Sequence, residues 1–159
     1  MGMGVRIATD LLAHILTEAA ASPDEICGLL FGTPDVIAAA QPCRNVATDP
    51  RARFEIDPAA LIAAHRAARA GGPALVGCYH SHPRGNAMPS PRDAADAEAN
   101  GWLWLIVGDG EVRAFRAVKV GSVDERFEPI RIVPSHPGLE PGSRFLHRSR
   151  VAGPGSRPG

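Results

Sequence analysis

The sequence predicts a single domain of the mixed α/β (α+β) class. Its 159 residues fit one domain of ordinary size and can bury a sufficient core without disulfides or a metal. Short apolar runs typical of strands occur together with stretches whose apolar residues recur at helical spacing. Because both patterns are present along one chain, a mixed fold with three main helices is expected.

Composition narrows the class of protein. The apolar fraction of 45% and the charged fraction of 21% are ordinary for a soluble globular domain. The formal net charge of zero gives no general attraction to nucleic acid or to an anionic membrane. No run approaches the roughly 20 apolar residues of a membrane span, and the N-terminus lacks a signal-peptide pattern. Three cysteines without framework spacing favour reduced thiols, so the predicted location is cytoplasmic.

The first third of the chain predicts one helix and a hairpin. Apolar residues on one face indicate a helix over 9–20, which the Ser-Pro-Asp turn at 22–24 ends. The apolar run 25–31 reads as a strand. A second strand over 36–41 follows the short turn at 33–35, so the two strands are expected to pair as a hairpin.

The middle of the chain predicts two further helices around a buried strand. Asp57 followed by a proline is a helix start, and it opens a helix over 58–70 that a pair of glycines ends. The β-rich run 74–80 is expected to be a buried strand. After an irregular loop, the segment 90–93 begins a helix that is expected to close at 100–101.

The last third predicts strands and then a tail. Strands over 102–108 and 111–120 are expected to form a hairpin about Asp109-Gly110, and a further strand covers 127–133. Residues 134–159 are rich in Pro, Gly, Ser and Arg and lack apolar periodicity, so a disordered tail is expected there. The folded domain is therefore assigned to residues 1–133.

His80 and His82 form a candidate metal site with Asp93. Residues at i and i+2 of an extended chain point to the same side, with Cα atoms about 6.5–7 Å apart, so both imidazoles can reach one ion. Pro83 helps to end the strand, and Asp93 enters from the first turn of the following helix. Two histidines and one carboxylate leave an open position on a tetrahedral zinc, as a catalytic site requires.

Each of these features also has an ordinary structural interpretation. A His-x-His pair is common by chance, and the segment from Ser90 to Asp93 is a capping box in which Asp93 serves the helix instead. Glu25 is the charged residue at the leading edge of the 25–31 strand and a candidate proton shuttle, although a strand-end glutamate often faces solvent. The combination of all these features is much rarer than any one of them.

Three linked motifs resemble those of the JAMM (MPN+) metallopeptidases. They are PDEICGLLFG at 23–32, GCYHSHP at 77–83 and SPRD at 90–93. Arg44-Asn45 and the segment 53–57 are similar to the compact bacterial members of that family. The resemblance covers about residues 5–133, and every position that holds the metal in the family matches.

The resemblance implies a role for each of five residues. His80, His82 and Asp93 would bind one Zn²⁺ per chain, Glu25 would act as general base and then acid, and Ser90 would help to hold the oxyanion. The implied fold is a curved mixed β-sheet flanked by helices, similar to that of cytidine deaminases.

The resemblance also implies a substrate class. The family cleaves peptide or isopeptide bonds that follow the C-terminal Gly-Gly of ubiquitin-like proteins, and compact bacterial members include peptidases that release cysteine from a sulfur carrier. The expected partner is therefore a ubiquitin-like sulfur-carrier protein, with no nucleic acid and no membrane. The alternatives are a metal-free scaffold domain, a RadC-like protein, which would carry upstream DNA-binding sequence, and a phage-tail assembly peptidase. The oligomeric state is not predicted.

Several residues near the motifs have more than one interpretation. Cys27 and Cys78 share the parity of the motif residues, so they are either small core thiols or neighbours of the metal. Trp102 and Trp104 favour packing over ligand stacking, and a solvated helix face accounts for the two acidic residues Asp96 and Glu98 that follow Asp93. The loop 84–89, which includes Arg84 and Met88, borders the candidate site.

Overall fold

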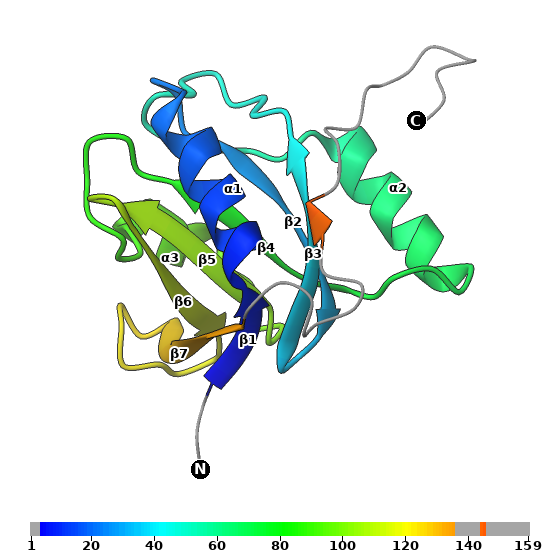
Figure 1. Cartoon of the computed structure of the whole chain (residues 1–159). Helices are drawn as coiled ribbons and strands as arrows, with labels where there is room; N and C mark the ends of the chain where they lie inside the picture. The colour runs from blue at the N-terminus through cyan, green and yellow to red at the C-terminus, as the bar shows by residue number, and fades with distance from the viewer. Residues whose placement is uncertain (1–3, 136–143, 146–159) are drawn as a thin grey trace.

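A computed structural model describes residues 4–135 and 144–145 of the chain. Figure 1 shows one sheet with helices on its two sides. The strands are β1 (Gly4–Ala8), β2 (Cys27–Thr33), β3 (Val36–Cys43), β4 (Leu75–Ser81), β5 (Leu103–Gly108), β6 (Glu111–Ala117), β7 (Phe127–Ser135) and β8 (Arg144–Phe145). The helices are α1 (Thr9–Ala20), α2 (Pro58–Arg69) and α3 (Pro91–Asp96).

The sheet is mixed and curls on itself. Its strand order is β1-β7-β6-β5-β4-β2-β3-β8, and an additional pairing joins β1 to β3. Because β1 pairs in parallel with both β7 and β3, strands β1 to β7 form a closed ring. Strand β4 lies in the middle of this order, antiparallel to β2 and parallel to β5. The strand that carries the histidine motif is therefore hydrogen-bonded on both edges.

The two faces of the sheet carry separate parts of the core. Leu11 and Ile15 of α1 pack on one face, and Tyr79 of β4 belongs to the same cluster and donates a 2.8 Å hydrogen bond to Glu18 of α1. Cys78 belongs to the opposite face, because neighbouring side chains on a strand alternate. That opposite face is covered by α2 and by the segment around α3.

Most predicted elements are confirmed. The helix over 9–20 is α1, and the helix expected over 58–70 is α2, which Asp57 caps by accepting a 3.0 Å bond from the Ala59 amide. The hairpin expected after residue 31 is the antiparallel pair β2–β3. The turn at Asp109-Gly110 joins β5 to β6, and both of its residues have positive φ, 50° and 76°.

In five elements a predicted boundary is wrong by two residues or more. Strand β2 begins at Cys27, so Glu25 precedes the strand that was expected to start with it. Strand β3 ends at Cys43, not at residue 41.

Helix α3 ends at Asp96, not near residue 100, because Ala97 is extended (φ −71°, ψ 136°) and buries its side chain in the core. Strand β6 ends at Ala117, not at residue 120, because the Val118 amide turns to bond the Arg126 carbonyl. Strand β7 continues two residues beyond the predicted end at 133.

Two strands were not predicted at all. Strand β1 precedes the first predicted helix, and β8 falls inside the expected tail, where Arg144–Phe145 pair with β3. The rest of that expected tail, 136–143 and 146–159, lies outside the described residues. Within the part of the chain that the structure describes, no helix has the length and apolar character needed to cross a bilayer.

Candidate metal centre

The C-terminal end of β4 positions the two histidines. His80 is fully buried, and Ser81 ties the strand to the start of β2. The Ser81 amide donates to the Ile26 carbonyl at 3.1 Å, and its hydroxyl accepts from the Ile26 amide at 2.9 Å. The His82 amide donates to the Val107 carbonyl of β5 at 2.7 Å. Both imidazoles therefore project from backbone that is fixed on either side.

Three side-chain atoms converge at the end of β4. The Nε2 atoms of His80 and His82 lie 3.2 Å apart, and each lies 3.1 Å from Oδ2 of Asp93. A zinc ion at about 2.0–2.1 Å from tetrahedral ligands requires ligand atoms about 3.3 Å apart. The residue types and their spacing fit one Zn²⁺, and the predicted ligands are brought together by three separate contacts.

Contacts at the other ring nitrogens decide how each histidine can act. Nδ1 of His82 donates to the Asn86 carbonyl at 2.8 Å, which leaves the Nε2 lone pair available for a metal. Nδ1 of His80 is buried and has no hydrogen-bond partner among the described residues.

Aromatic rings fix the orientation of His80. Phe54 stacks on its imidazole with 4.2 Å between ring centroids and 18° between planes, and Trp104 meets the ring edge-on at 5.6 Å. Burial among these rings lowers the pKa of His80, and this outweighs the hydrogen bond to the Asp93 carboxylate, which raises it. His80 is therefore kept neutral, which is the form that binds a metal.

Asp93 serves the helix and the candidate site through the same oxygen. Its Oδ2 accepts from the Ser90 amide at 2.9 Å, while the Asp93 amide donates to the Ser90 hydroxyl at 3.0 Å, which completes the capping box. The cap therefore does not keep this oxygen from the two histidines, and that Asp93 also serves as a metal ligand stays a prediction. The cap holds the carboxylate where both imidazoles meet it.

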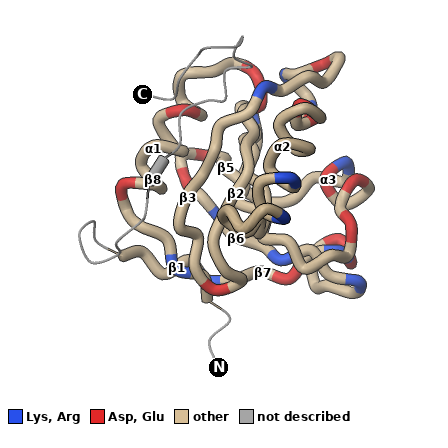
Figure 2. Tube along the Cα trace, turned by 90° about the vertical axis from the view of Figure 1, so that its right-hand side faces the viewer, with Lys and Arg blue, Asp and Glu red and all other residues tan. Residues whose placement is uncertain are grey.

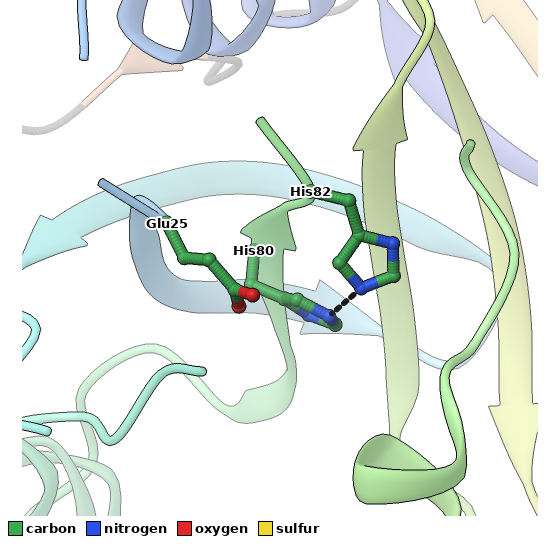
Figure 3. A group of neighbouring side chains, drawn as sticks. All are labelled: Glu25, His80 and His82. Carbon is green, nitrogen blue, oxygen red and sulfur yellow. Dashed lines mark hydrogen bonds between the residues drawn. The ribbon is translucent and has the colours of Figure 1, made fainter. Parts of the chain in front are cut away.

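Glu25 lies beside the histidines without bonding to them. One of its carboxylate oxygens and the two imidazole nitrogens lie within 4.8 Å of one another, and Figure 3 shows the carboxylate directed towards the His80 ring. No hydrogen bond joins this carboxylate to either ring among the described residues. Glu25 is only 6% exposed, so it does not face solvent as a strand-end glutamate would.

The two carboxylates differ in distance and in acidity. Asp93 makes 3.1 Å contacts with both imidazoles, whereas Glu25 makes no hydrogen bond to either ring in the part of the chain that the structure describes. Together with the two histidines, Glu25 forms a group that could also hold a metal ion. Burial raises the pKa of Glu25 to about 7, opposed by the charge of His82. Burial acts in the same direction on Asp93, but hydrogen bonds from His80 and His82 outweigh it and hold the pKa of Asp93 well below its ordinary value. Such a pair suits one carboxylate for the metal and the other for proton transfer.

His82 differs from His80 in its charge preference. Burial lowers the pKa of His82. Hydrogen bonds to Asp93 and to the Asn86 carbonyl, together with the nearby Glu25, raise it by more than burial lowers it. The net pKa of His82 is above its ordinary value. The nearby carboxylates thus favour the charged form of His82.

Asn45 was missed as a functional residue by reasoning from the sequence. Its amide nitrogen donates to the Glu25 carbonyl at 2.9 Å and makes two further contacts, while its amide oxygen accepts from two backbone amides. The Glu25 amide in turn donates to the Pro50 carbonyl at 2.7 Å. One side chain thus joins the Glu25 segment to the loop 44–56. The other partners of the Asn45 side chain are the carbonyls of Pro50 (3.3 Å) and Arg53 (3.0 Å) and the amides of Ala47 (3.0 Å) and Glu55 (3.1 Å).

A cleft of about 420 Å³ opens beside the histidines. Glu25, His82 and Ser90 line it, together with Arg51 and Arg84, and it is called the arginine-rimmed cleft below. The 84–89 loop lines this cleft, so the expectation that it borders the candidate site is confirmed. A substrate bond placed here would lie beside Glu25, His82 and Ser90.

The cysteines lie on the face expected from their parity. Cys27 is the cross-strand partner of His80, and Cys78 belongs to the core cluster on the same face of the sheet. Both thiols are buried, at 0% and 3% exposure. Their effect on activity stays a prediction.

Comparisons with known proteins agree with this geometry. Residues 8–119 match the family model described as prokaryotic homologs of the JAB domain. The chain is 38% identical over 108 residues to a desampylase from Haloferax volcanii, an alignment covering 65% of this chain and 78% of the relative. It is 41% identical over 105 residues to a probable TtuB-protein conjugate cleaving protease from Thermus thermophilus, covering 65% of this chain and 66% of that protein, just under two thirds of its length.

A solved structure shows the same fold. The solution structure of a protein from Desulfitobacterium hafniense superimposes with a TM-score of 0.69 at 25% sequence identity. The match covers 83% of this chain and 93% of that protein. The mixed fold predicted from the sequence is therefore shared along most of both chains.

Proposed function

The chain belongs to the family of prokaryotic homologs of the JAB domain and is a hydrolase of the JAMM type, and from that premise we propose that it is a zinc-dependent peptidase or isopeptidase. Its proposed substrate is a ubiquitin-like sulfur-carrier protein, cut at the bond that follows a C-terminal Gly-Gly. The names of the relatives support a ubiquitin-like partner, because one is a desampylase and another cleaves TtuB-protein conjugates. A cytosolic location is part of the proposal.

The observation that carries the proposal is the arrangement of the two carboxylates around two histidines. His80, His82 and Asp93 present three atoms 3.1–3.2 Å apart, and Glu25 lies within 4.8 Å of the histidines without joining them. A metal-free scaffold would have no use for three donor atoms at ligand spacing beside a second buried carboxylate. The geometry therefore favours the enzyme over the scaffold alternative.

The three ligands would hold Zn²⁺, which when bound supplies a Lewis acid that acidifies water and polarises a carbonyl. Glu25 would take the proton of the attacking water, because its pKa of about 7 matches the working pH of a general base. The same carboxyl group would then return the proton to the leaving amine. Both transfers use one side chain that is held in place by its backbone contacts.

Ser90 is proposed to stabilise the charge that develops on the scissile carbonyl. Its hydroxyl oxygen accepts from the Asp93 amide, so the hydroxyl hydrogen remains available to a group in the arginine-rimmed cleft. A donor in such a position contributes roughly 10²–10³ in rate to comparable reactions. The capping box keeps this donor next to the ligands.

The test is direct hydrolysis of defined substrates. The purified protein would be loaded with Zn²⁺ and incubated with ubiquitin-like carriers whose Gly-Gly is followed by cysteine, by a short peptide or by a lysine-linked peptide. Mass spectrometry of the products then reports which bond breaks. Cleavage after the second glycine is expected, and intact substrates in the presence of bound Zn²⁺ would contradict the proposal. Carriers ending in Gly-Ala serve as matched controls.

A further inference from the structure

A second cleft lies on the face of the sheet that α2 and α3 cover. Its volume is about 620 Å³, and aromatic side chains form much of its wall. Phe54, Trp102 and Trp104 line it, from the loop before α2 and from the region of β5. The two tryptophans were expected to pack, and their rings also border this open space.

The charged residues of this cleft are mainly acidic. Glu55, Asp96 and Glu98 line it, against a single arginine, Arg53. None of the three carboxylates forms an ion pair within residues 4–135. Acidic positions are marked in red along α3 and the segment next to it in Figure 2. We call this second cleft the acid-rimmed cleft. Its carboxylates attract cations, and the faces of its aromatic rings attract cations as well.

The acid-rimmed cleft reaches the back of the candidate metal centre. Phe54 lines the cleft and stacks on His80 at 4.2 Å, and Trp104 lines it and meets the same ring at 5.6 Å. One layer of aromatic rings thus separates the cleft from a metal ligand. A segment bound in the cleft is therefore close enough to belong to the same substrate as a bond cut at the centre.

The two clefts that adjoin the centre differ in charge. Arg51 and Arg84 line the first, and three carboxylates line the second. A basic peptide is repelled by the arginines of the first cleft and attracted by the carboxylates of the second. Charge therefore determines which part of a substrate occupies which cleft. An isopeptide substrate also has two different halves, the carrier tail on the acyl side and the target segment around the acceptor lysine on the amine side.

We propose, resting on the function above, that the acid-rimmed cleft binds the amine half of an isopeptide substrate and selects target segments with lysine or arginine next to the acceptor lysine. The carrier tail then occupies the arginine-rimmed cleft beside Glu25. Glu55, Asp96 and Glu98 act on specificity, without a role in the reaction itself.

Binding can be measured without any turnover, because both tryptophans of the chain line this cleft. Zinc-loaded protein would be titrated with three lysine peptides that differ only in flanking residues, which are arginine, alanine or glutamate. Tryptophan fluorescence is expected to respond to the arginine-flanked peptide with a Kd about tenfold lower than to the glutamate-flanked one, as several weak charge pairs would produce. Equal Kd values for the three peptides would overturn the proposal.

Matched variants separate the cleft from the general charge of the protein. The triple variant Glu55→Gln, Asp96→Asn, Glu98→Gln should bring the ratio of Kd values close to one. A control triple variant, Asp10→Asn, Asp35→Asn, Glu111→Gln, removes the same charge from exposed positions that line neither cleft. It should keep the tenfold preference. Loss of the preference in the control, or its persistence in the cleft variant, would overturn the proposal.

A cleavage assay then connects the cleft to the reaction. The same peptides would be joined through the lysine amine to a carrier ending in Gly-Gly, and kcat/KM would be compared for the wild type and the two triple variants. The wild type is expected to have a kcat/KM about tenfold higher for the arginine-flanked conjugate than for the glutamate-flanked one. Only the triple variant of Glu55, Asp96 and Glu98 should lose this preference. If no conjugate is cut, the proposed function fails, while the fluorescence titration still decides whether the cleft binds basic segments.

Discussion

His80 and His82 project from the buried end of a strand that is paired on both edges, whereas Glu25 projects from a loop that one side chain, Asn45, ties to its surroundings. The histidine backbone is fixed by β2 and β5. The Glu25 backbone is fixed by the contacts of its amide with Pro50 and of its carbonyl with Asn45. The metal half of the candidate site thus rests on the sheet, and the proton-transfer half rests on loops.

This difference indicates that metal binding and proton transfer depend on separate parts of the fold. The proposed metal ligands need fixed spacing, because atoms 3.1–3.2 Å apart would share one ion, and a sheet with a capped helix provides that spacing. A proton shuttle must face first the water and then the leaving amine, which a side chain on a loop can do. Changes to either half should therefore leave distinguishable signatures in metal content and in turnover.

The largest expected effect comes from the metal half. His82→Ala removes one of three ligand atoms at a partly exposed position, so bound Zn²⁺ and hydrolysis should both be lost. Metal content by mass spectrometry and product formation are the measurements. A circular-dichroism melt of the metal-free forms controls for folding. Full activity with substoichiometric zinc would exclude His82 as a ligand.

The next effect separates the two halves. Glu25→Gln keeps the shape of the side chain but removes its ability to accept a proton, so kcat should fall by about 10²–10⁴. Zinc content should stay at one per chain, because His80, His82 and Asp93 already present three ligand atoms 3.1–3.2 Å apart. Loss of the metal in this variant would show that Glu25 is a ligand, and turnover near the wild-type rate would remove it from the mechanism.

The elements that the sequence could predict are those set by local pattern. The helix over 9–20 follows from apolar spacing, and the hairpin at Asp109-Gly110 follows from residues that accept positive φ. The convergence of His80 and His82 follows from strand alternation. Each of these signals is contained within a few neighbouring residues, so no tertiary information is needed.

The elements that escaped prediction depend on distant contacts. Strand β1 exists through pairing with β7, more than 120 positions later, and α3 stops because Ala97 is needed in the core. The role of Asn45 consists of bonds to backbone groups of residues 25, 47, 50, 53 and 55, which leave no pattern in residue types. The acid-rimmed cleft likewise combines separate segments around positions 54 and 96–104.

A smaller effect tests the proton-transfer half of the candidate site through Asn45. Asn45→Ala leaves the Glu25 carbonyl and other backbone groups without their partner, which should cost about 1–3 kcal/mol of stability. Displacement of Glu25 should lower kcat roughly 10- to 100-fold at unchanged zinc content, as for other residues that orient a site.

A control is needed because the loop also carries Phe54, which stacks on His80. Asn45→Asp keeps the oxygen that accepts from the Ala47 and Glu55 amides but loses the donor to Glu25. It should lose kcat while KM and zinc content stay unchanged. It should also lose at least as much stability as Asn45→Ala, because a carboxylate oxygen then faces the carbonyls of Glu25, Pro50 and Arg53. Equal loss of zinc and of turnover in both variants would mean that Asn45 acts on the whole site and not on Glu25.

The smallest effect appears in the stability of the metal-free protein against pH. The pKa of Glu25 is raised from 4.5 to about 7 by burial, so between these values the folded state holds a proton that the unfolded state has released. Stability therefore falls as the pH rises through this window, and above about pH 7 the folded protein contains a buried charge.

Glu25→Gln should melt like the wild type at pH 4.5 and be more stable at pH 8, by on the order of 1–3 kcal/mol. Asp93 is ionised in both states across the upper part of this window, because its pKa is lowered, and the histidines titrate in both proteins. Chemical denaturation of both proteins in chelator at the two pH values measures the difference. A gap that is the same at pH 4.5 and pH 8 would show that burial does not raise the pKa of Glu25 in the folded protein.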